Sequence, residues 1–242
     1  MAEQDRPPFA DVLTDLCKNP VDGRPAWTNV ALAERVRELG GDINQAYIAS
    51  LRTGRQDNPT VEVMVQLAGA LGVHPAALVG GRRERRPDER PGWRRTALAT
   101  LFDTAYPADR GPYTPGEVAN AINEHGVCGT ISRMHVRELR DQTAVNPKLK
   151  HLLGLAWHFG VRPEYFLDDE HAARVDAEYA QLRVLAELGV ISLVTRINER
   201  PDLSPETRQL ALESLTRALD PGLGPGEWVF RPGSPAESDA PE

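Results

Sequence analysis

The stretch Ile43-Asn44-Gln45-Ala46-Tyr47-Ile48-Ala49-Ser50-Leu51-Arg52-Thr53-Gly54 decides the fold of this 242-residue chain. Its apolar residues Tyr47, Ile48 and Leu51 recur at helical spacing and predict a short helix over about residues 44–52 with one buried face. Gly54 is well placed to end that helix, because glycine accepts the backbone conformation found just after a helix. The start of the helix is left with polar and small side chains: Asn44, Gln45, Ala46 and Ala49.

Further helical segments lie on both sides of this stretch. Residues 9–17 carry a helical stripe of apolar side chains, and Thr28 is a predicted N-cap for a helix that ends at Gly40-Gly41. Thr60 is predicted to open a fourth helix, and Pro75 a fifth turn through Leu78. Because no segment alternates with the period of a strand over a useful length, the predicted class is all-α.

The same pattern returns 88 residues later. Residues 51–59 align with residues 139–147, both ending in Asn-Pro, and Gly72-Val73 aligns with Gly160-Val161. Upstream the offset is 86, so the second copy has two extra residues. We therefore predict a tandem duplication. The helices expected in the second copy cover about residues 93–106, 114–124, 132–140, 146–159 and 163–167.

The chain beyond residue 167 has a different pattern. A long helix carries apolar residues at three- and four-residue spacing and could continue to Ile197, and Ser204-Pro205 predicts the start of another helix. The side chains expected to form a dimer contact are Val175, Tyr179, Leu182, Leu185, Leu212 and Leu215. The predicted organisation is a first bundle at 1–80, an Arg-rich linker at 81–92, a second bundle at 93–168, a helical dimerisation domain at 169–220 and a disordered Pro/Gly-rich tail at 221–242.

Two short helices around a tight turn, inside a five-helix bundle, form the layout of a helix-turn-helix. Asn and Gln side chains can make paired hydrogen bonds to adenine, and a small Ala side chain can contact a thymine methyl group. The residues expected at base edges in the first copy are therefore Asn44, Gln45, Ala46 and Ala49. Those expected at phosphates are Thr28 at a helix start, Ser50, Arg52, Arg55 and Asn58.

In the second copy the corresponding helix is more highly charged. Its expected DNA-contacting residues are Arg133, His135, Arg137 and Arg140. Glu138 and Asp141 lie beside them, and like charges oppose binding to a polyanion. Two interpretations stay open: direct DNA contact, or a structural or protein-binding role.

Charge and composition narrow the function classes. The chain has a formal charge of −7, yet residues 81–95 hold seven basic and three acidic side chains. This stretch is either a solvated linker or an arm that follows DNA phosphates. No apolar run is long enough for a membrane helix, and the N-terminus lacks a signal-peptide pattern. Cys17 and Cys128 are too few for a disulfide framework, which favours the cytoplasm, and Cys128 is expected to be a small buried residue.

We expect no metal, no cofactor and no enzymatic activity. His151 and His158 share a helix but have no Cys or carboxylate at ligand spacing. No nucleophile, base and orienting group are recognisable together, and no phosphate-binding glycine loop is present.

The residues from Thr28 to Pro59 resemble the XRE family of Cro/repressor-type, lambda-repressor-like domains. The resemblance rests on Thr28-x-x-Ala31-Leu32-Ala33, on Ile43 to Gly54 and on Asn58-Pro59. The second half, from about Leu98 to Leu219, is similar to the EspR-type actinobacterial nucleoid-associated regulators. The stretches that carry this similarity are Leu101 to Pro107, Arg110 to Thr114, Glu117-Val118, Asn146-Pro147 and Tyr165 to Glu170.

These resemblances imply a helix-turn-helix that binds DNA, followed by a helical dimerisation domain. We therefore expect a DNA-binding transcription regulator of the cytoplasmic nucleoid whose partners are duplex DNA and a second copy of the chain, without a membrane. The alternative is a regulator whose bundles, above all the second, bind a protein instead of DNA. The sequence indicates neither an effector nor the target site.

Overall fold

The computed structural model is helical throughout the part of the chain that it describes. The described residues are 8–21, 23–86, 89, 92–107, 110–126, 128–144, 146–187 and 189–219. The chain divides into two compact units, the first formed by Met1–Tyr106 with Pro112–Asp176 and the second by Pro107–Gly111 with Ala177–Glu242. The predicted disordered tail at 221–242 lies outside the described residues. None of the described helices is long and apolar enough to cross a membrane.

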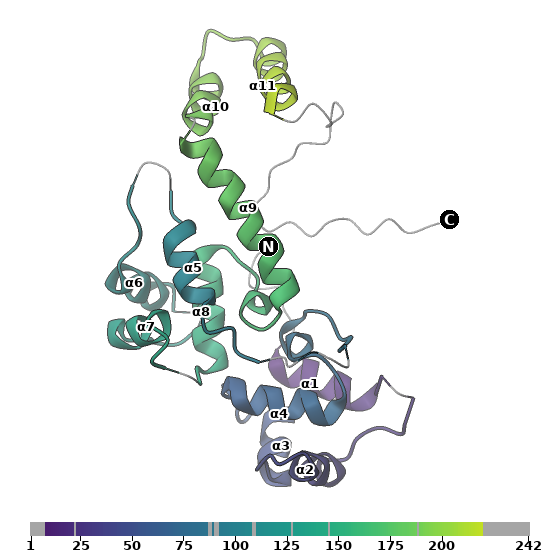
Figure 1. The fold of residues 1–242 in the computed structure, drawn as a ribbon. Helices are drawn as coiled ribbons and strands as arrows, with labels where there is room; N and C mark the ends of the chain where they lie inside the picture. Colours follow the sequence, from purple (N-terminus) through teal and green to yellow (C-terminus); the bar gives the residue numbers. More distant parts are fainter. Residues whose placement is uncertain are drawn as a thin grey trace. The chain divides into compact units, whose positions relative to one another are not determined.

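The first unit contains two successive bundles with the same order of elements (Figure 1). The elements of the first bundle are α1 (Phe9–Lys18), α2 (Asn29–Glu38), α3 (Gln45–Arg52), α4 (Val61–Leu71) and the 3₁₀ helix η2 (Pro75–Val79). Those of the second are α5 (Ala97–Thr104), α6 (Pro115–His125), α7 (Arg133–Arg140), α8 (Leu149–Phe159) and η3 (Pro163–Phe166). Each bundle thus has four helices followed by a 3₁₀ helix.

Local capping signals explain where the helices of the first bundle begin. Thr28, Asn44 and Thr60 are the N-caps of α2, α3 and α4, and each side chain accepts a hydrogen bond from a backbone N–H of the first turn. These bonds satisfy donors that have no partner inside the helix. In the second bundle Thr114 caps α6 in a reciprocal pair with Glu117, as a capping box does.

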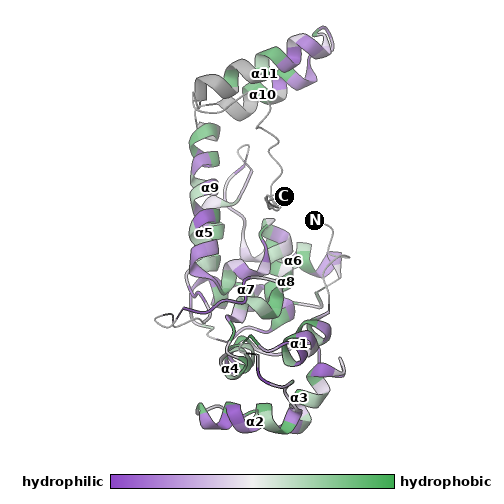
Figure 2. Cartoon of the chain, turned by 90° about the vertical axis from the view of Figure 1, so that its right-hand side faces the viewer, coloured by the Kyte–Doolittle hydropathy of each residue, from purple (hydrophilic) through white to green (hydrophobic). Residues whose placement is uncertain are grey.

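Each bundle has its own apolar core. Leu13, Leu32, Ile48 and Leu67 bury one face of α1 to α4, and the equivalent helices of the second bundle bury residues such as Leu139. Hydrophilic and hydrophobic residues accordingly alternate around α1 and α2 (Figure 2). Cys17 and Cys128 are both buried within these cores, in agreement with the burial expected for Cys128. Burial raises the pKa of the Cys17 thiol.

Two helices of the second bundle begin later than predicted. The helix expected from residue 93 begins at Ala97, because the Arg94 N–H donates to the carbonyl of Phe166 at 3.0 Å and Trp93 stacks on the Phe166 ring. The helix expected from residue 146 begins at Leu149, because the preceding residues pair with the first bundle. Both corrections come from contacts between segments far apart in the sequence.

The remaining helices are α9 (Asp169–Glu187), α10 (Val190–Glu199) and α11 (Pro205–Leu219). The first residues of α9 belong to the first compact unit, where Ala172 is fully buried and Asp176 accepts a hydrogen bond from the Tyr165 hydroxyl. The predicted long helix does not continue to Ile197, because Gly189 has a φ of 72° and precedes a separate helix. Ser204 caps α11 as predicted, and its Oγ accepts from the Thr207 N–H at 3.2 Å.

Candidate nucleic-acid interface

The first turn of α3 is a polar, solvent-exposed surface on a firmly held helix. Ile48 and Leu51 are completely buried beneath it. Gln45 and Ala46 are exposed, whereas Ala49 on the next turn is half-buried. Asn44 is exposed too, and its Oδ1 accepts from the Tyr47 N–H at 2.8 Å. The cap uses only the amide oxygen, so this contact leaves the Nδ2 group available as a donor.

Thr28 marks the start of α2, the helix that precedes α3. Its side chain is exposed, and Oγ1 accepts from the Ala31 N–H at 3.1 Å. The first turn of a helix carries unpaired N–H donors and a partial positive charge, which favours an anion. The structure thus places Thr28 at the exposed start of α2, and its phosphate contact stays a prediction.

Other predicted phosphate contacts have different positions. Arg52 is half-buried, and its Nη1 donates to Oδ1 of Asn29 at 2.7 Å, so this side chain braces α3 against α2. Ser50 donates its hydroxyl to the Tyr47 carbonyl of its own helix at 2.7 Å. Arg55 is exposed beyond the end of α3. Among these three side chains, Arg55 best fits a phosphate-contacting role.

Asn58 lies at a contact with the second bundle. It was expected at a DNA phosphate, but its Oδ1 accepts from the backbone N–H of Lys150 in the second bundle at 2.9 Å. The side chain is half-buried at this contact between bundles. Its amide oxygen therefore helps to join the two bundles, because it caps a helix of the other one.

The exposed face of α7 is strongly charged and largely paired within itself. Arg137 and Arg140 both donate to the Asp141 carboxylate, at 3.3 and 2.9 Å, and these hydrogen bonds hold the pKa of Asp141 below its ordinary value. Arg140 also lies over the Phe102 ring, with 5.6 Å between its guanidinium carbon and the ring centroid. His135 lies 3.4 Å from Glu138, between the Nδ1 and Oε2 atoms.

Two side chains at the start of α7 face solvent. Arg133 is exposed, and no carboxylate in the described part of the chain lies within ion-pair distance of it. Met134 is 56% exposed and was not among the expected site residues. The offset of 88 residues places Met134 opposite Ala46, so the alignment of the two copies carried the signal that would have identified it.

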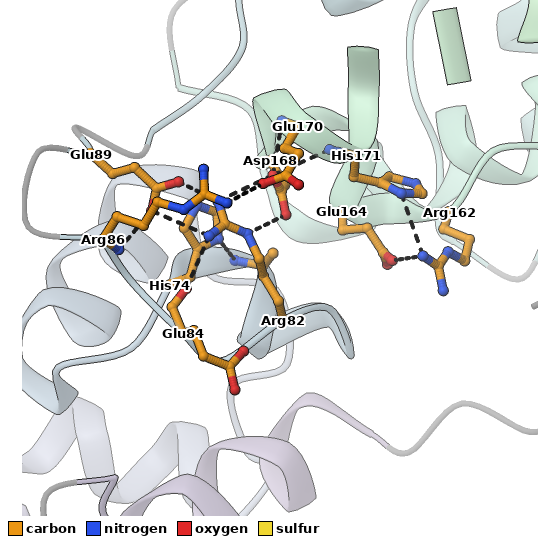
Figure 3. A network of polar contacts seen from close by, with 11 residues as sticks. His74, Arg82, Glu84, Arg86, Glu89, Arg162, Glu164, Asp168, Glu170 and His171 are labelled. Carbon is orange, nitrogen blue, oxygen red and sulfur yellow. Dashed lines mark hydrogen bonds and ion pairs between the residues drawn. The ribbon is translucent and has the colours of Figure 1, made fainter. Parts of the chain in front are cut away.

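Three arginines of the Arg-rich linker form ion pairs with carboxylates of the chain, although the side chains of Arg83 and Arg86 stay exposed. Arg82 donates from Nε to Asp168 at 2.7 Å and also pairs with Glu89, while Arg86 pairs with Glu170 at 2.8 Å (Figure 3). Arg83 pairs with Asp15 at 2.6 Å. These guanidinium groups therefore bind carboxylates of the protein itself, and both interpretations of the linker stay predictions.

The fold and this surface define a class: an all-helical protein with two similar bundles, each exposing a short capped helix. Over 121 residues the chain is 32% identical to the nucleoid-associated protein EspR of Mycobacterium tuberculosis, with the same match in strains CDC 1551 / Oshkosh and ATCC 25618 / H37Rv. The match covers 50% of this chain and 90% of EspR. This chain therefore belongs to the family of the nucleoid-associated protein EspR. No model of a protein family matches the chain.

Proposed function

We propose that this chain is a DNA-binding regulator of the nucleoid that contacts duplex DNA through two tandem helix-turn-helix units. One observation carries the proposal: membership of the EspR family coincides with an exposed polar turn on a buried, capped helix, α3. The nucleoid association of EspR supports the same function and location for this chain. A binding role, without catalysis, is part of the proposal.

In this proposal α3 is the element that contacts base edges. Gln45 supplies a paired donor and acceptor suited to adenine, and Ala46 and Ala49 supply methyl groups that fit against thymine. Thr28 and Arg55 contact phosphates on either side of the groove and hold the helix in register. Asn44 caps α3 with its oxygen and has its Nδ2 group available for the same surface.

The second unit contributes through α7, with Arg133 as the side chain best placed to contact a guanine. A specific observation also favours a protein partner for this face. Met134 is exposed beside it, and Asp141 neutralises Arg137 and Arg140. The alternative function is therefore a regulator whose second bundle binds protein while the first binds DNA.

We further propose that two chains associate through α9, α10 and α11. The apolar side chains expected to form this contact are half-buried within the single chain: Val175, Tyr179, Leu182, Leu185, Leu212 and Leu215. Leu210 on α11 is 64% exposed, and Leu193 on α10 is 45% exposed. Burial of such side chains against a second copy would remove apolar area from water, which favours association.

A salt titration with a labelled random-sequence duplex tests the proposed function. Binding through phosphates releases counterions, so the association constant should fall steeply as salt is raised. The measurement is fluorescence anisotropy of the full chain with duplex at increasing salt, with a neutral labelled peptide as the control. An absence of duplex binding at low salt would overturn the proposal and favour the protein-binding alternative.

A further inference from the structure

The two bundles join through a reciprocal contact, the Asn-Pro bridge, formed by residues 58–62 and 146–150. Thr60 and Lys148 form an antiparallel bridge, the single backbone pairing of this kind among the described residues. An antiparallel bridge has a local two-fold axis between its strands. The backbone hydrogen bonds run from the Val61 N–H to the Pro147 carbonyl at 2.9 Å and from the Leu149 N–H to the Pro59 carbonyl at 2.8 Å.

The side-chain bonds of the bridge are reciprocal as well. Oδ1 of Asn58 accepts from the Lys150 N–H at 2.9 Å, and Oδ1 of Asn146 accepts from the Glu62 N–H at 3.0 Å. Asn146 lies 88 residues after Asn58, and Lys150 lies 88 residues after Glu62. Exchanging the two copies therefore converts each of these two side-chain bonds, and each of the two backbone bonds, into the other of its kind.

These bonds satisfy groups that a helix cannot satisfy by itself. Val61 and Glu62 are the first two residues of α4, and Leu149 and Lys150 are the first two of α8. Their N–H groups have no acceptor inside their own helix. Each helix start is thus capped by the other bundle, and separation of the bundles would leave four donors to be satisfied by water.

The centre of the bridge is also shielded from solvent. Val61 and Leu149 are only 2% and 3% exposed, and Pro59 and Pro147 are buried. At the rim, the Lys150 ammonium pairs with Asp57 at 2.7 Å. Buried apolar contact and satisfied backbone groups distinguish this contact from two bundles connected only by a linker.

We propose that the Asn-Pro bridge makes one chain an internal pseudo-dimer, in which α3 and α7 contact two half-sites of one duplex at a fixed spacing. This inference rests on the proposed DNA binding. Helices α3 and α7 each end shortly before one arm of the Asn-Pro bridge. The local two-fold axis of the bridge therefore relates α3 to α7, just as a two-fold axis relates the subunits of a dimeric helix-turn-helix protein. Such proteins take half-sites about one helical turn, roughly 34 Å, apart.

The two half-sites must differ in sequence. At equivalent positions α3 carries Gln45 and Ala46, and α7 carries Arg133 and Met134. Gln pairs best with adenine and Arg with guanine, so the two helices prefer different bases. The ligand is therefore a non-palindromic, two-part duplex site that a single chain covers.

The test starts by selecting sites from a random-sequence duplex library with the full chain. We expect a site of two unlike elements, in which the Gln45→Ala variant changes the preference at one element and Arg133→Ala changes it at the other. The selected duplex is then lengthened between the elements by half a turn (about five base pairs) or a full turn (about ten). If the two bundles are held rigidly, each insertion should lower the affinity at least about tenfold, because one of the two sequence elements can then no longer be contacted.

Flexibly tethered bundles would tolerate the full-turn insertion, and this result would overturn the proposal. So would a palindromic site in which Gln45→Ala changes both halves, since that pattern needs two chains. The Asn58→Ala/Asn146→Ala double variant should recover tolerance of the full-turn insertion, with Asn198→Ala on α10 as the matched control. If the double variant does not fold, the wild-type insertion series decides. Loss of all salt-sensitive duplex binding would instead refute the proposed function.

Discussion

Arg82 and Asp168 form an ion pair between residues 86 positions apart, with 2.7 Å between Nε and Oδ2. Asp168 is only 4% exposed, and Glu89 binds the other edge of the same guanidinium. Burial by itself would raise the pKa of Asp168, but the hydrogen bonds from Arg82 and from the His171 N–H, with the Arg82 charge, outweigh it and hold that pKa below its ordinary value. The pair thus ties the segment after the first bundle to the end of the second.

Arg82→Ala should destabilise the chain by about 2–4 kcal/mol, because it leaves a buried carboxylate without its partner. Thermal or denaturant unfolding measures this loss. Arg83→Ala is the matched control: the Arg83–Asp15 pair is exposed at both ends, and such pairs contribute less than about 1 kcal/mol. Neither change should alter the salt slope of duplex binding. A slope that falls with Arg82→Ala would mean that the guanidinium contacts phosphate.

Gln142→Gly should stabilise the chain by about 1 kcal/mol. Gln142 has a φ of 62° just after α7, where the equivalent residue in the first bundle is Gly54 with a φ of 72°. A side chain is strained in this conformation, and glycine is not. Chemical denaturation checks the gain, and Gly54→Ala should show the opposite sign. Equal stability of Gln142→Gly and the wild type would indicate that the glutamine side chain contributes a compensating contact.

How much of the fold the sequence predicts depends on whether the cause is local. The predicted helix starts at Thr28 and Thr60 are confirmed, because a cap needs only a polar side chain and the turn that follows it. The predicted start of α8, residue 146, was wrong by three residues, because Asn146 is held in a bridge with the first bundle instead of in the helix. Sequence position alone carries no sign of that partner.

The sequence likewise predicts those features of the candidate site that have a local cause, and not those that depend on tertiary contacts. The exposed position of Gln45 and the burial of Ile48 follow from helical spacing, and the structure confirms both. The positions of Arg52 and Asn58 do not follow from it, because Asn29 and Lys150 are brought to them by tertiary packing. An arginine or asparagine near an expected phosphate fits a contact with DNA and a contact with the protein equally well until its neighbours are known.

Stability should fall as the pH is lowered from 6.5 toward 4. Burial, followed by nearby cationic groups, lowers the pKa of His151 and of His171 to about 4, against 6.5 when unfolded. Between these values the unfolded chain binds more protons than the folded one, so the free energy of unfolding decreases as the pH falls. Because both rings are partly exposed, the loss should be on the order of 1 kcal/mol per histidine.

Denaturant unfolding at several pH values measures this dependence. His171→Gln should flatten it, because the variant has no group to protonate in that range. His125→Gln is the control on an exposed histidine. An unchanged pH dependence in His171→Gln would show that this ring titrates alike in the folded and unfolded chain.

Gln45→Ala should relax base preference at one position at a cost of about 1–3 kcal/mol, with little loss on random duplex. Arg55→Ala should instead weaken binding to all sequences and reduce the salt slope by nearly one unit. Site selection and salt titration on both variants separate the two effects. A reversed pattern, with Arg55→Ala changing the preferred sequence, would place the base contacts beyond the end of α3.

Leu182→Glu/Leu185→Glu should convert a dimeric chain into folded monomers. Both leucines are half-buried on α9 within the single chain, and a charge placed in an apolar contact between chains costs several kcal/mol unless it is paired. Gln181→Glu is the matched control, since it adds a charge to a neighbouring exposed position.

Sedimentation measures the mass of each variant, and circular dichroism measures its helix content. A wild-type chain that sediments as a monomer would refute the dimer, and a double variant that stays dimeric would place the contact elsewhere. Because the internal pseudo-dimer needs no second chain, a monomeric double variant should still bind the two-part duplex site.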